Sequence, residues 1–137
     1  MKSFLTLILL FLSTSHCRLA ESDLTFRWFN SYDGKRYELY FMKSDVDNAP
    51  LWRESEPNPP LSLRAAIAKA GEVVKRIPDS TEWKLNSITL ERVGSRDGMW
   101  VYLVRFKPYQ KDTITLGPAA FIVPILLDGK TPELKVK

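Results

Sequence analysis

The stretch Leu61–Pro78, which reads LSLRAAIAKAGEVVKRIP, is the one long amphipathic helix that the sequence predicts. Its apolar residues recur every three or four positions and therefore share one face of a helix with 3.6 residues per turn. These residues are Leu63, Ala66, Ile67, Ala70, Val74 and Ile77. Ser62 is a natural N-cap and Pro78 cannot continue a helix, so both ends are defined. We expect the strands predicted elsewhere to form a sheet that packs on this helix.

Gly71 interrupts the predicted helix beside its apolar face, where glycine costs about 1 kcal/mol relative to alanine. It lies one turn after Ile67 and is surrounded by alanines, which indicates a helix that a sheet approaches closely. The opposite face, with Arg64, Glu72 and Lys75, has mixed charge and no evident task. We therefore expect the helix to be scaffold rather than binding surface.

The first residues, MKSFLTLILLFLSTS, carry one positive charge, then an apolar run, then small residues. This order is typical of a secretory signal peptide, and the apolar run is shorter than the roughly 20 residues that span a bilayer. We expect residues 1–17 to be a signal peptide, cut between residues 15 and 20. The protein is then exported to the periplasm or the extracellular space. Cys17 could instead carry a lipid anchor, although His16 before it is a poor match to such sites.

The same boundary limits the chemistry, because His16 and Cys17 are the chain's only histidine and only cysteine. A mature chain that starts at Arg18 has neither, which excludes thiol nucleophiles, Ser-His-Asp triads and His- or Cys-ligated metals. Loss of Lys2 leaves 19 basic against 16 acidic residues, a formal charge of +3. Because the two signs alternate along the chain, we expect no nucleic-acid partner. We also expect no cofactor and no metal.

Alternating apolar and polar residues predict strands on both sides of the helix. The predicted strands lie in a hairpin over residues 24–42, then in residues 83–93, 99–106 and 119–127, with a short charged strand at 133–137. Between Leu85 and Ile88 the apolar residues change parity, which predicts a β-bulge near Asn86-Ser87. Pro124 lacks a backbone donor, so it must face outward, sit at a bulge or lie on an edge.

The predicted order is two strands, a Pro-rich loop over residues 43–60, the helix, three strands and a short C-terminal edge strand. Strands that are not separated by further helices predict an α+β fold, with one helix packed on an antiparallel β-sheet. The length suits one domain, residues 18–137. It comprises the hairpin, the loop, and the helix with its meander over residues 61–137.

Three stretches carry a resemblance to a known class. They are LSLRAAIAKA at residues 61–70, WVYLVRF at residues 100–106 and LLDGK at residues 126–130. With them, residues 60–137 resemble PepSY or PepSY-like small exported domains, in which a helix with this opening precedes a three-stranded antiparallel meander. The resemblance implies an exported protein with a peptidase-inhibiting or chaperone-like role. The hairpin and the Pro-rich loop lie outside it.

The sequence has no evident catalytic constellation. Asp45, Asp47 and Asn48 are close together, but they lack the glycine and the distant glutamate of an EF-hand loop and indicate a solvated acidic loop. Glu54 and Glu56, two residues apart in a Pro-rich loop, have no fixed geometry for acid–base work. We therefore do not expect an enzyme.

These observations favour a non-catalytic binding module, monomeric or weakly dimeric, that binds or inhibits a peptide or an exported protein through its sheet face or edge. The candidate binding residues are aromatic: Trp28, Tyr40, Trp52, Trp100 and Tyr102. Trp52 could equally pin the Pro-rich loop to the domain. One alternative is a small-ligand carrier with a pocket between helix and sheet. Another is a hydrolase that uses carboxylates alone.

Overall fold

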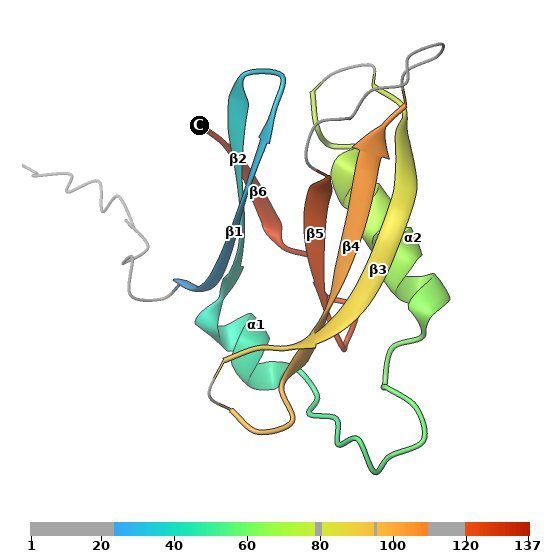
Figure 1. Ribbon diagram of the computed structural model, residues 1–137. Helices are drawn as coiled ribbons and strands as arrows, with labels where there is room; N and C mark the ends of the chain where they lie inside the picture. Colours follow the sequence, from blue (N-terminus) through green and yellow to red (C-terminus); the bar gives the residue numbers. More distant parts are fainter. Residues whose placement is uncertain (1–23, 79–80, 95, 110–119) are drawn as a thin grey trace, which may run out of the picture.

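The computed structural model contains two β-sheets, a longer helix against one of them and a shorter helix beside the other (Figure 1). It describes residues 24–78, 81–94, 96–109 and 120–137. In chain order the elements are β1 (Leu24–Tyr32), β2 (Lys35–Met42), α1 (Lys43–Asn48), α2 (Leu63–Val74), β3 (Trp83–Arg92), β4 (Trp100–Pro108), β5 (Phe121–Leu126) and β6 (Glu133–Val136). The predicted signal peptide, residues 1–17, and its cleavage site lie outside the described residues. Within the described part, neither helix is long and apolar enough to cross a bilayer.

The expected fold, one helix on a single antiparallel sheet, is wrong. The strands form two three-stranded antiparallel sheets, a first sheet in the order β1-β2-β6 and a second sheet in the order β3-β4-β5. In addition, the predicted loop begins with the helix α1. The fold is therefore β-rich. Alternation in a strand shows which side chains share a face, but it does not show that β6 pairs with β2, where Leu39 lies opposite Leu134.

Several local predictions are confirmed. The predicted hairpin over residues 24–42 is formed by β1 and β2, and it turns at Asp33-Gly34, where both residues have positive φ angles of 50° and 68°. α2 begins after Ser62, whose Oγ accepts a hydrogen bond from the Ala65 amide at 3.2 Å. The register between β3 and β4 shifts between Leu85 and Ser87, which is the predicted bulge.

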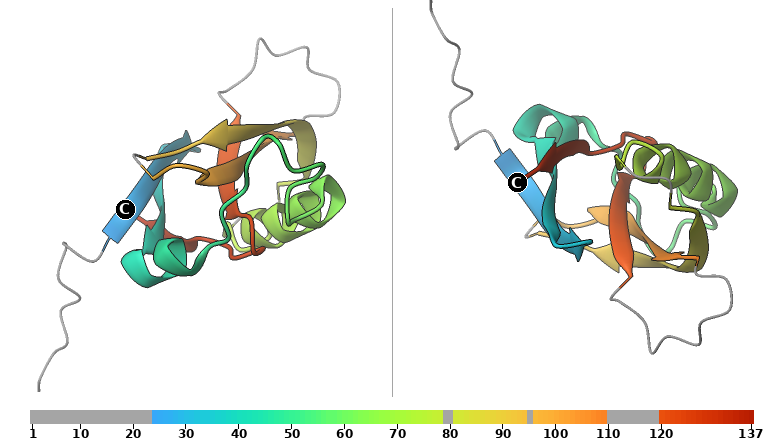
Figure 2. Two further views of the ribbon diagram at one scale, coloured as in Figure 1. Left: turned by 90° about the horizontal axis from the view of Figure 1, so that it is seen from below. Right: turned by 90° about the horizontal axis from the view of Figure 1, so that it is seen from above.

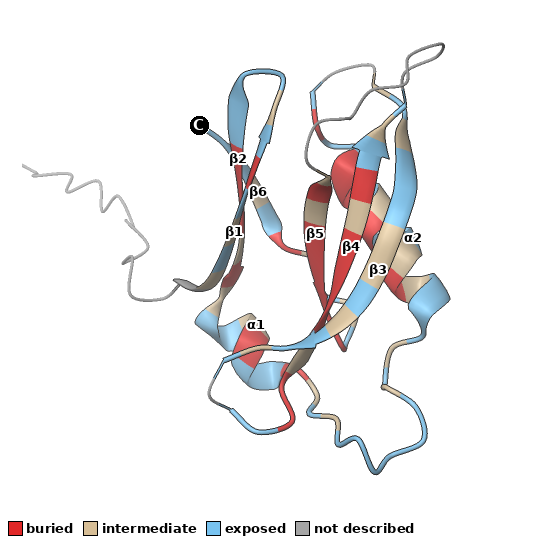
Figure 3. Ribbon diagram, viewed as in Figure 1, coloured by how far each residue is buried: buried red, intermediate tan, exposed pale blue. Residues whose placement is uncertain are grey.

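The main core lies where α2, β2 and one face of the second sheet meet. Its buried residues are Tyr37, Leu39, Ala66, Ala70, Val73, Val74, Ile77, Tyr102, Val104, Phe106, Phe121, Val123, Ile125 and Leu127. A second cluster on the opposite face of β4 and β5 contains Phe41, Val46, Ala49, Met99, Val101, Leu103 and Leu126. β4 and β5 are therefore covered on both faces, whereas β3 is mostly exposed (Figure 3). The views along the sheets show α2 on one side of the second sheet and the first sheet on another (Figure 2).

The Asn30 side chain links the two sheets by hydrogen bonds. The Asn30 amide of β1 donates to the Ile122 carbonyl of β5 at 3.0 Å and accepts from the Ile122 amide at 2.8 Å. The Asn30 side chain thus makes the two hydrogen bonds that a neighbouring strand would make at the outer edge of β5. Because backbone groups alternate in direction along a strand, Pro124 also faces away from β4. The missing donor of Pro124 therefore breaks no bond to β4, as the sequence required of it.

Candidate functional site

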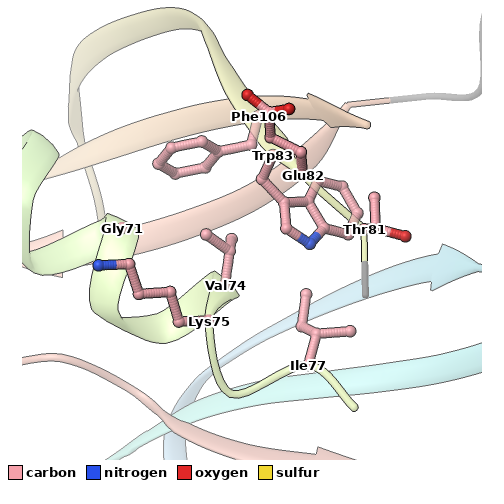
Figure 4. A pocket seen from close by; sticks show the side chains of 8 residues that line it. All are labelled: Gly71, Val74, Lys75, Ile77, Thr81, Glu82, Trp83 and Phe106. Carbon is pink, nitrogen blue, oxygen red and sulfur yellow. The ribbon is translucent and has the colours of Figure 1, made fainter. Parts of the chain in front are cut away.

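A pocket of about 430 Å³ lies between the end of α2 and the start of β3 (Figure 4). We call it the α2–β3 pocket. Its lining residues are Gly71, Val74, Lys75, Ile77, Thr81, Glu82, Trp83 and Phe106. Val74, Ile77 and Phe106 belong to the main core, so the pocket is an opening into the apolar interior. Its size is within the range of small-molecule sites and exceeds what one large side chain needs.

Gly71 forms part of the wall of this pocket. A Cβ atom built on Gly71 meets no atom of the described chain within 4 Å. The expectation that Gly71 allows a sheet to approach closely is therefore wrong, because the missing side chain leaves open space instead. A longer side chain at this position would project into the pocket, so the glycine keeps the space open.

Trp83 forms the opposite wall and is held by a cluster of aromatic rings. Its ring centroid lies 4.7 Å from that of Tyr32 and 5.4 Å from that of Phe121, both in edge-to-face contacts. The Tyr32 hydroxyl also makes a 2.6 Å hydrogen bond with Thr81 Oγ1 at the pocket rim. The two ring contacts come from β1 and β5 and fix the indole, so this wall is formed before any ligand arrives.

The pocket combines an apolar interior with a charged rim. In Figure 4 the Trp83 indole nitrogen points into the space near Val74 and Ile77. Lys75 and Glu82 are exposed at its border and carry opposite charges. This arrangement suits an apolar group that enters from solvent, with a hydrogen-bond acceptor for the indole N–H.

β3 is one of the two edge strands of the second sheet and begins at the pocket. The Val93 amide donates to the Met99 carbonyl, and the Tyr109 amide donates to the Glu82 carbonyl, so the residues directly after and before β3 point toward β4. Alternation on each side of the bulge then turns the backbone groups of five residues away from β4. They are Trp83, Leu85, Ile88, Leu90 and Arg92. In the described part of the chain no strand pairs with this side of β3.

Three of the predicted binding residues lie together at the other end of the second sheet. Trp52 and Trp100 make an edge-to-face contact with centroids 5.4 Å apart, and the Trp52 amide donates to the Gly98 carbonyl at 2.8 Å. The Tyr102 hydroxyl donates to the Leu61 carbonyl at 2.9 Å, and burial raises the pKa of this hydroxyl. Trp52 therefore does pin the Pro-rich loop. Both indole nitrogens are buried without a hydrogen-bond partner in the described residues.

The other two predicted residues lie on opposite faces of the first sheet. Trp28 is on the inner face, half-buried against the main core and 5.8 Å from the Phe26 ring. Tyr40 is half-buried on the outer face. Within the described ranges no ring contact joins either residue to the Trp52–Trp100 pair. The five aromatic residues do not form one site.

The acidic residues of the predicted loop have structural partners. Asp45 accepts a hydrogen bond from the Met42 amide at 3.2 Å and forms an ion pair with Lys130 at 3.2 Å, while Asp47 pairs with Lys43. Across the described ranges, no three His, Cys, Asp or Glu side chains gather where they could hold a metal ion.

The sequence predicted a pocket between helix and sheet only as an alternative, and it gave Trp83 no role beyond that of a strand residue. The signal that could have found the pocket is the costly Gly71 on the flank of a helix. The resemblance of residues 60–137 to PepSY-like domains stays a prediction. No protein-family profile, no curated protein and no solved structure matches this chain.

Proposed function

We propose that this chain is an exported, non-catalytic module that binds an extended peptide by strand addition to β3, with one apolar peptide side chain in the α2–β3 pocket. The observation that carries the proposal is the position of Trp83. Its indole forms a wall of the pocket, and its backbone is the first of the five outward-facing positions on the open edge of β3. Backbone pairing and a side-chain pocket together are how strand addition obtains both affinity and selectivity.

Exposed apolar residues extend the site along β3. Leu85 is 45% exposed and lies opposite Phe106, a pocket residue, so its side chain is on the pocket side of the sheet. On α2, Leu63 is 53% exposed, and Ile67 and Gly71 follow it at intervals of four residues on one flank of the helix. An added strand would place every second side chain toward this flank.

The same edge is protected from indiscriminate pairing. The bulge at Asn86 interrupts its regular register, and Lys84, Glu91 and Arg92 place charges along it. Selectivity then depends on the pocket, where burying one large apolar side chain contributes about 1.5–3 kcal/mol. A protein that presents such a peptide, including a peptidase, would be bound or inhibited at this edge.

The proposal can be tested with peptides selected from a random display library on the protein without residues 1–17. Gly71→Leu should fill the pocket and abolish binding, although leucine is a better helix former than glycine and the fold should gain stability. Ala68→Leu, on the exposed face of the same helix, is the matched control and should bind normally.

A second pair of variants tests the strand edge. Leu85→Pro removes an outward-facing donor that makes no bond to β4, so it should prevent strand addition without unfolding the edge strand. Leu85→Ala removes the same side chain and keeps the donor. If both variants bind the selected peptide equally well, the peptide does not pair with β3 and strand addition is refuted.

A small-ligand carrier is the second candidate, and the volume of the pocket favours it. The same variants separate the two functions. A carrier should lose its ligand in Gly71→Leu and be unaffected by Leu85→Pro, whereas a peptide binder should be impaired by both. Screening a library of small apolar acids and amides by their effect on the melting temperature supplies the ligand for this comparison.

A further inference from the structure

The outer face of the first sheet, which points away from the core, carries more cationic than anionic side chains. The register of the three strands places eight side chains with charged or aromatic groups on it. They are Arg27, Phe29, Arg36, Glu38, Tyr40, Glu133, Lys135 and Lys137. The four cations are all exposed, whereas one of the two carboxylates, Glu38, is only 4% exposed. Among these side chains, solvent therefore meets four cations and one carboxylate, that of Glu133.

An exposed aromatic ring stands among these cations. Phe29 is 47% exposed, and the Arg36 guanidinium lies 4.2 Å from its ring centroid. The Lys137 ammonium lies 5.9 Å from the same centroid on the neighbouring part of the face. Cation–π contacts of this kind hold the ring and the charges in a fixed arrangement without covering the ring.

Glu38 is buried beneath this face and pairs with two of its cations. It lies opposite Phe29 in the pairing of β1 with β2. One carboxylate oxygen is 2.6 Å from Lys137 Nζ, and the other is 3.6 Å from Arg27 Nε. The hydrogen bond from Lys137, aided by the charges of Lys137, Arg27 and Lys135, holds the pKa of Glu38 below its ordinary value despite its burial. The buried carboxylate thus keeps two cations close to the sheet around Phe29.

We infer that this outer face binds the surface of an anionic phospholipid bilayer, with Phe29 among the lipid headgroups and the four cations on the phosphates. The bilayer interface is the partner that presents anionic and apolar groups at adjacent depths over a broad surface, as this face requires. A soluble polyanion would use the cations but would leave Phe29 in water. The face belongs to the first sheet, so the inference does not depend on the site at β3 (Figure 1).

The test is co-sedimentation with large unilamellar vesicles, using the protein without residues 1–17. Vesicles of phosphatidylglycerol and phosphatidylcholine should bind it at least tenfold more tightly than vesicles of phosphatidylcholine alone, and 0.5 M NaCl should weaken that binding strongly. Phe29→Ala and Arg36→Glu should each weaken it at least fivefold, and Phe29→Trp should retain it. All these positions are exposed, and thermal unfolding of each variant confirms that it folds.

The chain offers a matched control in its second sheet. Lys84 also lies over an aromatic ring, 3.5 Å from the centroid of Tyr109, and is exposed. Lys84→Glu changes the net charge as Arg36→Glu does and should leave vesicle binding unchanged. Equal loss in both charge variants means attraction by net charge and overturns the inference. Equal binding to zwitterionic vesicles, full binding by Phe29→Ala, or competition by soluble glycerol phosphate at headgroup concentrations overturns it as well.

Discussion

Replacing Gly71 with alanine should stabilise this protein. The residue lies in the last turn of α2, where glycine costs about 1 kcal/mol relative to alanine. A substitution gains this amount only if the new Cβ fits, and here it meets no described atom within 4 Å. No contact in the described residues offsets the gain, so Gly71→Ala should raise the free energy of unfolding by about 1 kcal/mol.

Urea denaturation followed by circular dichroism measures the gain. With a urea dependence of roughly 2 kcal/mol per molar for a domain of this size, the midpoint should rise by about 0.5 M. The melting temperature should rise by about 4 °C. Ala68→Gly, at an exposed position of the same helix, should lower the midpoint by a similar amount, and the double variant should return near the starting value.

A lower or unchanged midpoint for Gly71→Ala would refute this reasoning. It would mean that a neighbour occupies the space beside α2 and that the pocket is closed at this point. If the midpoint rises while affinity for selected peptides falls, the glycine is retained for the pocket at the expense of stability, which is a familiar trade-off at binding sites.

Three further outcomes are expected. Because the pKa of Glu38 is lowered in the folded state, its charge stabilises the protein fully above the ordinary carboxyl pKa of 4.5, and this contribution is lost as the pH falls through the lowered pKa of the folded state. Urea midpoints of the wild type and Glu38→Gln should therefore differ at pH 7, and the difference should shrink as the pH is lowered below 4.5; a constant difference would contradict this. Asn30→Ala leaves both backbone groups of Ile122 without a partner and should cost about 2–3 kcal/mol in urea denaturation; a loss below about 0.5 kcal/mol would mean that these hydrogen bonds do not hold the sheets together. Gly98→Ala should cost at least about 1 kcal/mol, because φ is +75° and the new Cβ lies 3.3 Å from the Trp52 carbonyl oxygen; an unaffected melting curve would mean that the loop yields easily.

Local patterns predicted local structure well. The cap at Ser62, the turn at Asp33-Gly34 and the bulge beside Asn86 all follow from the chemistry of neighbouring residues, which the sequence displays directly. α1 was missed because six residues with one buried apolar side chain, Val46, are too short to show a helical period.

Long-range pairing could not be predicted in the same way. β2 and β6 are separated by α1, α2 and a whole sheet, and their alternation is compatible with many partners. Glu38 shows the consequence for burial, because its polar position in β2 predicts exposure and only the neighbouring strands show that Arg27 and Lys137 cover it. The open space at Gly71 likewise arises because no distant segment packs against this position, and a local sequence pattern does not show that.

The two hydrogen bonds between Asn30 and Ile122 determine which strand edges of the second sheet stay open to pairing. The edge of β5 is occupied by an amide and interrupted by Pro124, and the far edge of β6 is four residues long and charged. Of the two edges of the second sheet, β3 is then the one that is open to another strand in the described part of the chain. Loss of Asn30 would open the edge of β5 as well, and a sheet with two open edges can pair on both sides.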